Sequence, residues 1–352
     1  MKIAMTMMEP LDFDTRLAAL VAPGGEIATV TWTEHRVDPG TAARAVVAHV
    51  IPWGPARVAV TTSAGDWPYA AIHRATTAIP SHVDLLWAKA VPVGALPGED
   101  NNRIVRRDER FRLVLASPNE DPFERGLSGD ARRWRGLMRE TGARLERVSD
   151  ADRPSAARVI AQLHHAAATQ RGLVSDAQVG DRTAVVERLA THPAARAYLL
   201  VGSAGDLLAG TFGLVRGETF YGLVSGGLTE GVAGKKSANR LVKLAALDTM
   251  RAEGIRAYDF GIGETVEKQQ LCDTRETIVD LIVPFTLIGH GLAPLLGAHV
   301  AMRASAKRNG LGEVLRRWRR AHNTAPYAWP RLPAVIWRGN GKPKSAGRKT
   351  SC

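Results

Sequence analysis

Cysteine is scarce in this sequence, and its scarcity excludes a disulfide framework. Cys272 and Cys352 are the only two cysteines in 352 residues, and neither belongs to a CxxC pair. No metal-ligand spacing occurs, so no bound metal is expected. A long apolar run is also missing near the start, where Glu9, Asp12 and Asp14 follow at once. These absences predict a cytoplasmic protein without a signal peptide.

Net charge is absent from most of the chain. Thirteen Lys and Arg residues and one acidic residue, Glu313, follow Met302, and they account for the whole formal charge of +12. The 302 residues before them contain 34 basic and 34 acidic side chains. The high pI therefore belongs to a tail, and it gives no reason to expect a basic nucleic-acid-binding core.

The second half of the sequence alternates helix and strand patterns in an order that predicts one α/β domain. Helices are expected at residues 130–141, 155–170, 183–191 and 237–252, and strands at 143–148, 197–203, 207–215, 219–226 and 256–260. Tight turns at Gly205-Asp206 and Gly217-Glu218 join three of these strands into a meander. The last helix therefore begins shortly after a strand that ends in small residues.

The first 125 residues predict a less regular α/β or α+β lobe. Strands are expected at residues 27–32, 57–62 and 111–115, and a short helix at 41–50. The proline-punctuated stretch 117–122 is typical of a linker. The expected division is therefore an N-terminal lobe over 1–120, a domain over 125–285, a basic helical extension over 286–338 and a disordered tail over 339–352.

A glycine-rich loop before the helix at 237–252 is the first candidate site. Backbone N–H groups and the partial positive charge of a helix N-terminus attract phosphate, and glycine lets phosphate approach. The candidate ligands for a phosphate or pyrophosphate are Gly231, Gly234, Lys235, Lys236, Ser237, Asn239 and Arg240. Neither a P-loop nor a dinucleotide fingerprint is present. The competing interpretation is an ordinary loop with solvated lysines.

A second candidate site follows the strand at 256–260. Asp259, Glu264 and Lys268 would lie where this strand leaves the sheet, and a carboxylate there can act as a general base. The competing interpretation is that Asp259 caps a turn and that Lys268 is an exposed charge. His164 is an alternative base because imidazole titrates near neutral pH, although a packed or exposed helical histidine is the commoner case.

These segments, in this order, resemble the cellulose-biosynthesis (CelD-like) branch of the GNAT acyltransferases. The resemblance covers residues 125–285. It includes a basic opening helix with Arg132-Arg133-Trp134-Arg135, an LH…RG pattern at Leu163-His164 and Arg171-Gly172, and Asp259-Phe260-Gly261 with Gly263 and Lys268, which is similar to DFxxGxxxxK. Ile262, Glu267 and Ala168 replace an arginine and two aromatics of the family pattern, which implies a changed acceptor pocket.

The resemblance implies a GNAT-type α/β (α+β) fold: a mixed, mostly antiparallel sheet flanked by helices. It implies transfer of an acetyl or other acyl group from acyl-CoA to an amine or hydroxyl of a small molecule, sugar or cell-envelope precursor, as in bacterial polysaccharide biosynthesis. The 231–241 loop would hold the pyrophosphate of coenzyme A. Asp259, Glu264 or His164 would take the acceptor's proton. The N-terminal lobe would be a degenerate second copy of the fold, as in related two-lobed transferases.

Two other functions remain open on the sequence. Related peptidoglycan-bridge transferases use the same fold with aminoacyl-tRNA as donor. A degenerate, non-catalytic domain that binds a partner is the other.

The C-terminal region begins with 22 uncharged residues, from Leu281 to Met302. Their prolines, glycines and histidines favour a buried strand followed by a packed helix over a membrane span. The segment from Arg303 to Arg320 predicts a basic amphipathic helix that would contact an anionic membrane or tRNA. If it contacts a membrane, the protein would lie at the inner face of that membrane. A solvated helix covering the domain edge is the alternative.

Overall fold

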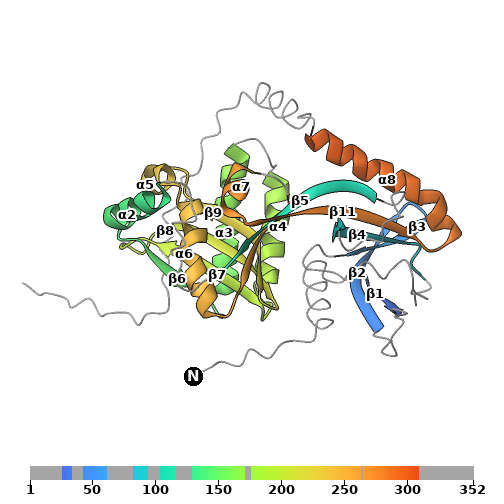
Figure 1. Cartoon of the computed structure of the whole chain (residues 1–352), viewed down its shortest axis with the longest axis horizontal. Helices are drawn as coiled ribbons and strands as arrows, with labels where there is room; N and C mark the ends of the chain where they lie inside the picture. Colours follow the sequence, from blue (N-terminus) through green and yellow to red (C-terminus); the bar gives the residue numbers. More distant parts are fainter. Residues whose placement is uncertain are drawn as a thin grey trace, which may run out of the picture.

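One eleven-stranded sheet organises the described part of the chain (Figure 1). The computed structural model describes residues 26–33, 43–61, 82–93, 104–115, 129–170, 176–262 and 265–308. The strands are β1 (Glu26–Thr33), β2 (Ala43–Trp53), β3 (Ala56–Thr61), β4 (Leu85–Pro92), β5 (Ile104–Val114), β6 (Arg144–Arg147), β7 (Ala195–Val201), β8 (Leu207–Arg216), β9 (Thr219–Gly227), β10 (Ala257–Ile262) and β11 (Thr274–Pro284). Their spatial order is β1-β2-β3-β4-β11-β5-β10-β9-β8-β7-β6.

The two halves of the sheet repeat one pattern of strand directions. In the N-terminal half, β1, β2 and β3 pair antiparallel, β3 and β4 pair parallel, and β4 pairs antiparallel with β11. In the C-terminal half, β7, β8 and β9 pair antiparallel, β9 and β10 pair parallel, and β10 pairs antiparallel with β5. Each half therefore contains a three-strand meander followed by one parallel neighbour.

The strands that complete the two halves are exchanged between them. β5 comes from the N-terminal part of the sequence but lies beside β10, and β11 comes from the C-terminal part but lies beside β4. β5 and β11 also pair with each other over most of their length, as the long central ribbons in Figure 1 show. The pairing of β5 with β10 and β11 therefore joins residues on the two sides of the expected boundary at 120–125 in one sheet.

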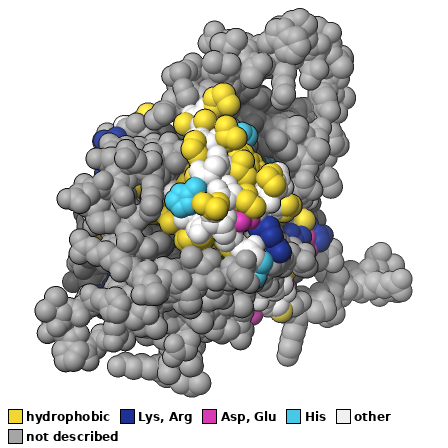
Figure 2. All heavy atoms as spheres, turned by 90° about the vertical axis from the view of Figure 1, so that its right-hand side faces the viewer, with side chains coloured by type: hydrophobic (Ala, Val, Ile, Leu, Met, Phe, Trp, Pro, Cys, Tyr) yellow, Lys and Arg dark blue, Asp and Glu magenta, His cyan; other side chains and the backbone are white. Residues whose placement is uncertain are grey.

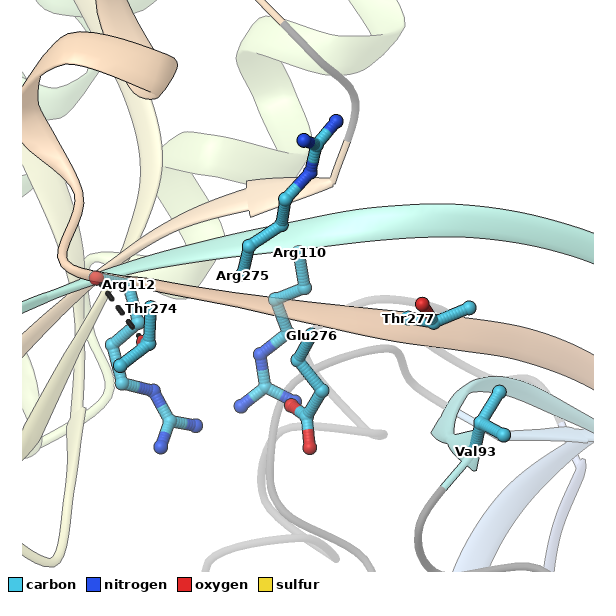
Figure 3. Close-up of a pocket in the computed structure, with 7 residues that line it drawn as sticks. All are labelled: Val93, Arg110, Arg112, Thr274, Arg275, Glu276 and Thr277. Atoms are coloured by element: carbon cyan, nitrogen blue, oxygen red, sulfur yellow. Dashed lines mark hydrogen bonds and ion pairs between the residues drawn. The ribbon is translucent and has the colours of Figure 1, made fainter.

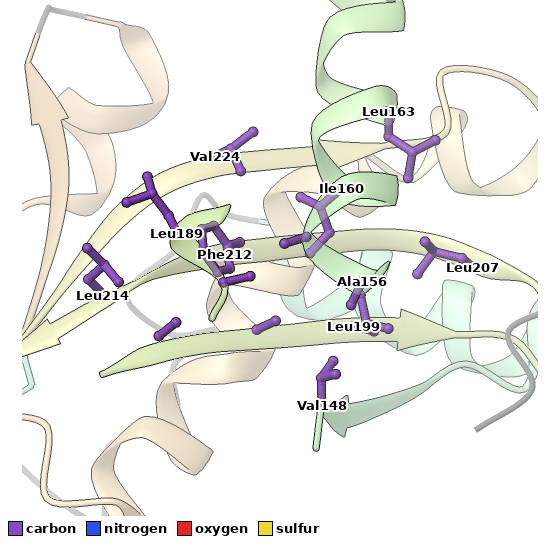
Figure 4. Packing of buried hydrophobic residues seen from close by; sticks show 14 of the residues in the cluster. Val148, Ala156, Ile160, Leu163, Leu189, Leu199, Leu207, Phe212, Leu214 and Val224 are labelled. Atoms are coloured by element: carbon purple, nitrogen blue, oxygen red, sulfur yellow. The ribbon is translucent and has the colours of Figure 1, made fainter. Parts of the chain in front are cut away.

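Helices cover both faces of the C-terminal half. On one face lie α3 (Arg153–Gln170) and α4 (Asp176–Leu189), and Figure 4 shows Ile160 and Leu163 of α3 packed over the strands. On the other face lie α6 (Ala238–Ala252) and α2 (Asp130–Thr141). The short helices α5 (Gly231–Lys235) and α7 (Val266–Leu271) flank the ends of β9 and β10. The mixed α/β fold class expected from the sequence is confirmed.

Helix α8 (Leu287–Arg308) covers one face of the N-terminal half (Figure 1). Its inner side packs Leu296 and Val300 against Val58, Leu85 and Ile282. The expected order of a buried strand followed by a packed helix is therefore confirmed by β11 and α8. Among the described residues, no helix combines the length and the apolarity needed to cross a membrane.

One expected element of the N-terminal lobe is wrong. Residues 41–50 were expected to form a helix because alanine is abundant there and favours helices. Ala43–Trp53 instead forms β2, which pairs with β1 over Ala43–Val50 and with β3 over Ala48–Trp53. This strand pairing satisfies backbone groups and outweighs the weak local preference. The linker at 117–122 and the tail from 309 onward lie outside the described residues.

Candidate active site

Strands β9 and β10 part after a short parallel contact. Only Thr219–Tyr221 of β9 pairs with Ala257–Asp259 of β10. β9 then continues to Gly227, while β10 ends after an irregular step at Gly261, whose φ is 76°. Past Tyr221, β9 has no strand neighbour on this side within the described ranges. A thioester could lie along such an opening and meet backbone N–H groups.

A cavity of about 340 Å³ lies where β9 ends. Three parts of the chain form it: the second half of α3, the last residues of β9 with the following loop and α5, and the start of α6. It is lined by His164, Ala167, Ser225, Gly226, Gly227, Leu228, Thr229, Gly234, Ser237, Ala238 and Asn239. Its size is within the range of small-molecule sites.

Two adjacent glycines let both helices approach the end of β9. A methyl group on Gly226 would lie 2.5 Å from the His164 backbone nitrogen and 2.6 Å from the Ile160 carbonyl oxygen. A methyl group on Gly227 would lie 3.0 Å from the Asn239 backbone nitrogen. The small residues at the end of this strand, visible in the sequence, therefore set the distance between the helices and the cavity floor.

Gly226→Ala is expected to destabilise the fold by about 1–3 kcal/mol, because the added methyl group would overlap backbone atoms of α3. Urea denaturation measures the change. The matched control is Gly291→Ala on α8, where an added methyl group meets no atom within 4 Å and the backbone φ is ordinary. That control is expected to be neutral or stabilising, since alanine favours helices. Equal stabilities of G226A and the native chain would contradict the close contact between α3 and β9.

The first turn of α6 presents backbone donors to the cavity. Helix N–H groups point toward the N-terminus, and those of the first turn have no partner within the helix. Ala238 and Asn239 supply these groups and line the cavity. Ser237, which precedes them, has φ of 59° and makes no side-chain capping bond. This corner therefore offers two backbone donors to a ligand, and the Asn239 Oδ1 beside them is buried without a hydrogen-bond partner.

The expected cationic ligands of the loop lie elsewhere. Arg240 is buried, and its Nε donates to Asp130 Oδ2 at 2.8 Å, which fastens α6 to α2. Lys236 pairs with Glu140 of α2 at 3.0 Å. Lys235 and Gly231 are exposed, and neither lines the cavity. Of the seven candidate ligands, the cavity lining therefore contains Gly234, Ser237 and Asn239.

His164 is the expected proton acceptor that the cavity contains. Its Nδ1 lies 2.8 Å from the Ser225 carbonyl oxygen. A carbonyl can only accept, so Nδ1 carries the proton. In the neutral imidazole, Nε2 then has a free lone pair. The helix that carries this residue packs directly on β9, and this explains why an exposed histidine has a fixed tautomer.

Asp259 has both carboxylate oxygens occupied. Oδ2 accepts from Arg110 Nε of β5 at 2.5 Å, and Oδ1 accepts from the Gly261 backbone N–H at 2.7 Å. Asp259 is 3% exposed and does not line the cavity at β9. Arg110 was not predicted as the partner of Asp259, because it belongs to the N-terminal lobe, 149 residues away in sequence. Glu264, the other expected carboxylate, lies outside the described residues.

Lys268 holds the end of β10. Its Nζ donates to the carbonyl oxygens of Gly261 and Ile262, at 3.2 and 2.9 Å. Burial lowers the pKa of this ammonium, and the nearby Asp259 opposes that shift. Burial also raises the pKa of the neighbouring Cys272 thiol to about 12. Cys272 is therefore protonated at neutral pH and is a poor nucleophile.

A second, open cavity of about 570 Å³ lies along β5 and β11 (Figure 3). It is lined by Val93, Arg110, Arg112, Thr274, Arg275, Glu276 and Thr277. Figure 3 shows Arg110, Arg112 and Glu276 on one side of the strands and Arg275 on the other. Arg110 also lies 3.7 Å from Glu276, and Arg275 pairs with Glu109. Three arginines and one glutamate are among its lining residues, so its charged side chains are mainly cationic, and Arg110 and Arg275 are already paired with carboxylates.

Comparison with known proteins places these features in one family. Residues 129–269 match the model of an acetyltransferase (GNAT) domain. This part of the chain is a GNAT domain. The match includes α2, α3, β9, α6 and β10, the elements that build the cavity and the opening between the strands. It does not identify the CelD-like branch. No curated protein matches the sequence.

Solved structures extend the likeness over most of the chain. The crystal structure of FemX has a TM-score of 0.53 at 10% identity, over 80% of this chain and 93% of that one. The C-terminal domain of a putative lysylphosphatidylglycerol synthetase from Agrobacterium fabrum has a TM-score of 0.45 at 12% identity, over 82% and 91%. A tandem GNAT protein from the clavulanic acid pathway has a TM-score of 0.40 at 16% identity, over 79% and 90%. The likeness to FemX concerns the fold alone.

Proposed function

We propose that this chain is an acyltransferase that moves an acyl group from coenzyme A to an amine or hydroxyl acceptor, with His164 as the base. The observation that carries the proposal is the cavity at the end of β9, where a histidine with a free Nε2 faces the first turn of α6 across a glycine floor. Its place in a GNAT domain supports the reaction class.

The donor would lie with its phosphates at the start of α6 and its thioester along the opening of β9. Ala238 and Asn239 would donate backbone hydrogen bonds to phosphate oxygen, and the helix dipole would favour that negative charge. The uncharged lining makes this a site of backbone donors rather than of lysine side chains. Lys236 and Arg240 would then act indirectly, since their ion pairs hold α2 beside the loop.

The chemistry would be direct attack on the thioester carbonyl. The acceptor nitrogen or oxygen forms a bond to the carbonyl carbon, and His164 Nε2 takes the acceptor's proton. Backbone N–H groups of β9 past Tyr221 stabilise the negative charge on the carbonyl oxygen. The carbon–sulfur bond then breaks, coenzyme A leaves as a thiolate, and solvent or the imidazolium returns a proton to the sulfur. Positioning of donor and acceptor supplies much of the rate.

The cavity along β5 and β11 is the proposed place for part of the acceptor. Arg112, Thr274 and Glu276 offer it hydrogen-bond donors and acceptors. A hydroxyl-bearing acceptor such as a sugar, or an amine-bearing precursor that also carries an anionic group, matches this lining of three arginines and one glutamate. We also propose that the N-terminal lobe is a degenerate second copy of the GNAT fold, which the repeated order of strand directions supports.

A thermal-shift titration with coenzyme A, acetyl-CoA and longer acyl-CoAs tests the donor. A ligand that binds only the folded chain raises the melting temperature. Failure of every thioester to raise it would contradict the use of coenzyme A, and aminoacyl-tRNA would then be tested as donor. Binding without turnover across amine and hydroxyl acceptors would favour a non-catalytic domain.

Asn239→Asp is expected to weaken coenzyme A binding about tenfold, since a carboxylate would repel the phosphates at the helix start. At a fixed excess of ligand this removes about 1.4 kcal/mol of ligand-dependent stabilisation. The ligand-dependent rise is compared with each variant's own apo melting temperature, because a carboxylate oxygen buried without a partner at the Oδ1 position lowers the stability of the apo protein. Lys235→Ala is the control and is expected to bind normally. Strong weakening by Lys235→Ala alone would instead favour a lysine-based phosphate site.

A further inference from the structure

The outward side of α8 is unusual for a surface helix. Its exposed residues from Leu287 to Met302 are Leu287, Ile288, His290, Gly291, Pro294, Leu295, Ala298, His299 and Met302, none of which carries a formal charge with neutral histidine. Exposed sides of helices usually carry charged residues. Helix α2 of the same chain follows this rule, with Arg132, Arg135, Arg139 and Glu140 exposed.

The large apolar side chains on this side form a stripe. Leu287 is 91% exposed, Leu295 60% and Met302 67%. Together with Gly291 and Ala298 they follow one another at intervals of three or four residues, which places them along one line of the helix. We call this line the α8 stripe. Figure 2 shows this end of the molecule, where hydrophobic side chains form a continuous band with histidines beside it.

The α8 stripe is separate from the packed side of the same helix. Leu296 and Val300 are buried against the N-terminal half of the sheet, with Leu292 and Ala293 beside them. The fold therefore already uses one side of α8, and the stripe is additional. It also lies outside the GNAT domain and contributes no residue to either cavity.

We propose that the α8 stripe lies on the surface of an anionic lipid bilayer, with the helix parallel to the membrane plane. Charge complementarity selects this occupant. The uncharged stripe is followed directly by Arg303, Lys307 and Arg308 on the last turns of α8, and residues 303–352 carry thirteen basic side chains against one acid. An apolar helix side next to a strongly basic segment matches the interface of anionic membranes, where apolar side chains enter the acyl boundary and basic ones meet headgroups.

Co-sedimentation of the full chain with vesicles tests this proposal. Vesicles of phosphatidylcholine with phosphatidylglycerol should bind the chain, and pure phosphatidylcholine should bind it much less. The double variant Leu295→Glu/Met302→Glu is expected to lower partitioning onto the anionic vesicles about tenfold or more, because two charges replace the inserting side chains. Met138→Glu is the matched control: Met138 is 38% exposed on α2, in the C-terminal half of the molecule and far from α8 (Figure 1), and its change should leave binding intact.

Three outcomes would overturn the proposal. The first is a lack of binding to anionic vesicles. Binding of tRNA by the same chain would not rescue the proposal. Equal binding of the native chain and of L295E/M302E is another, since attraction would then be carried by basic residues without the stripe. The third is a native dimer that L295E/M302E converts into a monomer, because a second copy would then cover the stripe. The melting temperature of L295E/M302E must match that of Met138→Glu. If it does not, the milder Leu295→Gln replaces the double variant in the sedimentation test.

Discussion

His164→Asn is expected to lower kcat about 10²–10⁴-fold, the usual contribution of a positioned general base. The asparagine amide can place its nitrogen near the position of the imidazole Nδ1, so the hydrogen bond to the Ser225 carbonyl is retained. The atom that is lost is Nε2, the proposed proton acceptor. Steady-state kinetics with the acyl-CoA and acceptor found by screening measure the change. Coenzyme A binding and the melting temperature should stay near the native values.

The same variant separates a base from a structural histidine. If His164 only anchors α3 to β9, His164→Asn keeps the anchoring bond and should keep most of the activity. His164→Ala removes both functions and should lower stability as well as rate. An active His164→Asn enzyme would contradict the proposed role, and the proton would then have to be taken by another group or by water. The pH profile adds a second readout, because loss of a base removes the corresponding limb of the kcat curve.

Local patterns were sufficient to predict most of the C-terminal half. Helix α2 spans the expected residues 130–141, and α6 begins within one residue of the expected start. The meander of β7, β8 and β9 follows from its two glycine turns, since Gly205 and Gly217 both have positive φ. Each of these signals lies within the element or its turn. Strand β4 was missed, because Leu85–Pro92 is a short apolar run without a clear period.

Partners distant in sequence explain what local patterns missed in the site. Lys236 and Arg240 looked like phosphate ligands because they follow glycines, but their acidic partners, Glu140 and Asp130, lie about a hundred residues earlier. The contact of Arg110 with Asp259 could not be predicted from local patterns for the same reason. His164 was only the alternative base in the prediction from sequence, because nothing in its helix shows that Gly226 brings α3 against β9. Whether such residues bind a ligand or one another is decided by tertiary packing.

Asp259→Ala is expected to destabilise the fold by about 3–5 kcal/mol, because it removes the buried counter-ion of Arg110, for which the exposed Glu276 at 3.7 Å is a weaker partner. The side chains of Arg110 and Asp259 are 6% and 4% exposed, so water cannot replace the lost partner. The Gly261 N–H would lose its acceptor too. Urea denaturation measures the loss. The double variant Arg110→Met/Asp259→Ala removes both charges and should recover much of the stability, since a buried pair can often be replaced by apolar side chains.

Variants of this pair also distinguish a catalytic base from a structural ion pair at Asp259. They test as well whether β5, from the N-terminal part of the chain, is held beside β10. Arg110 belongs to β5, so the contact joins the N-terminal part of the chain to the GNAT domain across the β5–β10 pairing. If Asp259 were the base, Asp259→Asn would abolish turnover while the chain stayed as stable as the native one. If the pair is structural, Asp259→Asn should lower stability, and the activity of the remaining folded fraction should change much less than in His164→Asn. A stable Asp259→Ala protein would contradict the tight ion pair. It would also mean that the shared sheet alone, through the pairing of β5 with β10 and β11, holds the two lobes together.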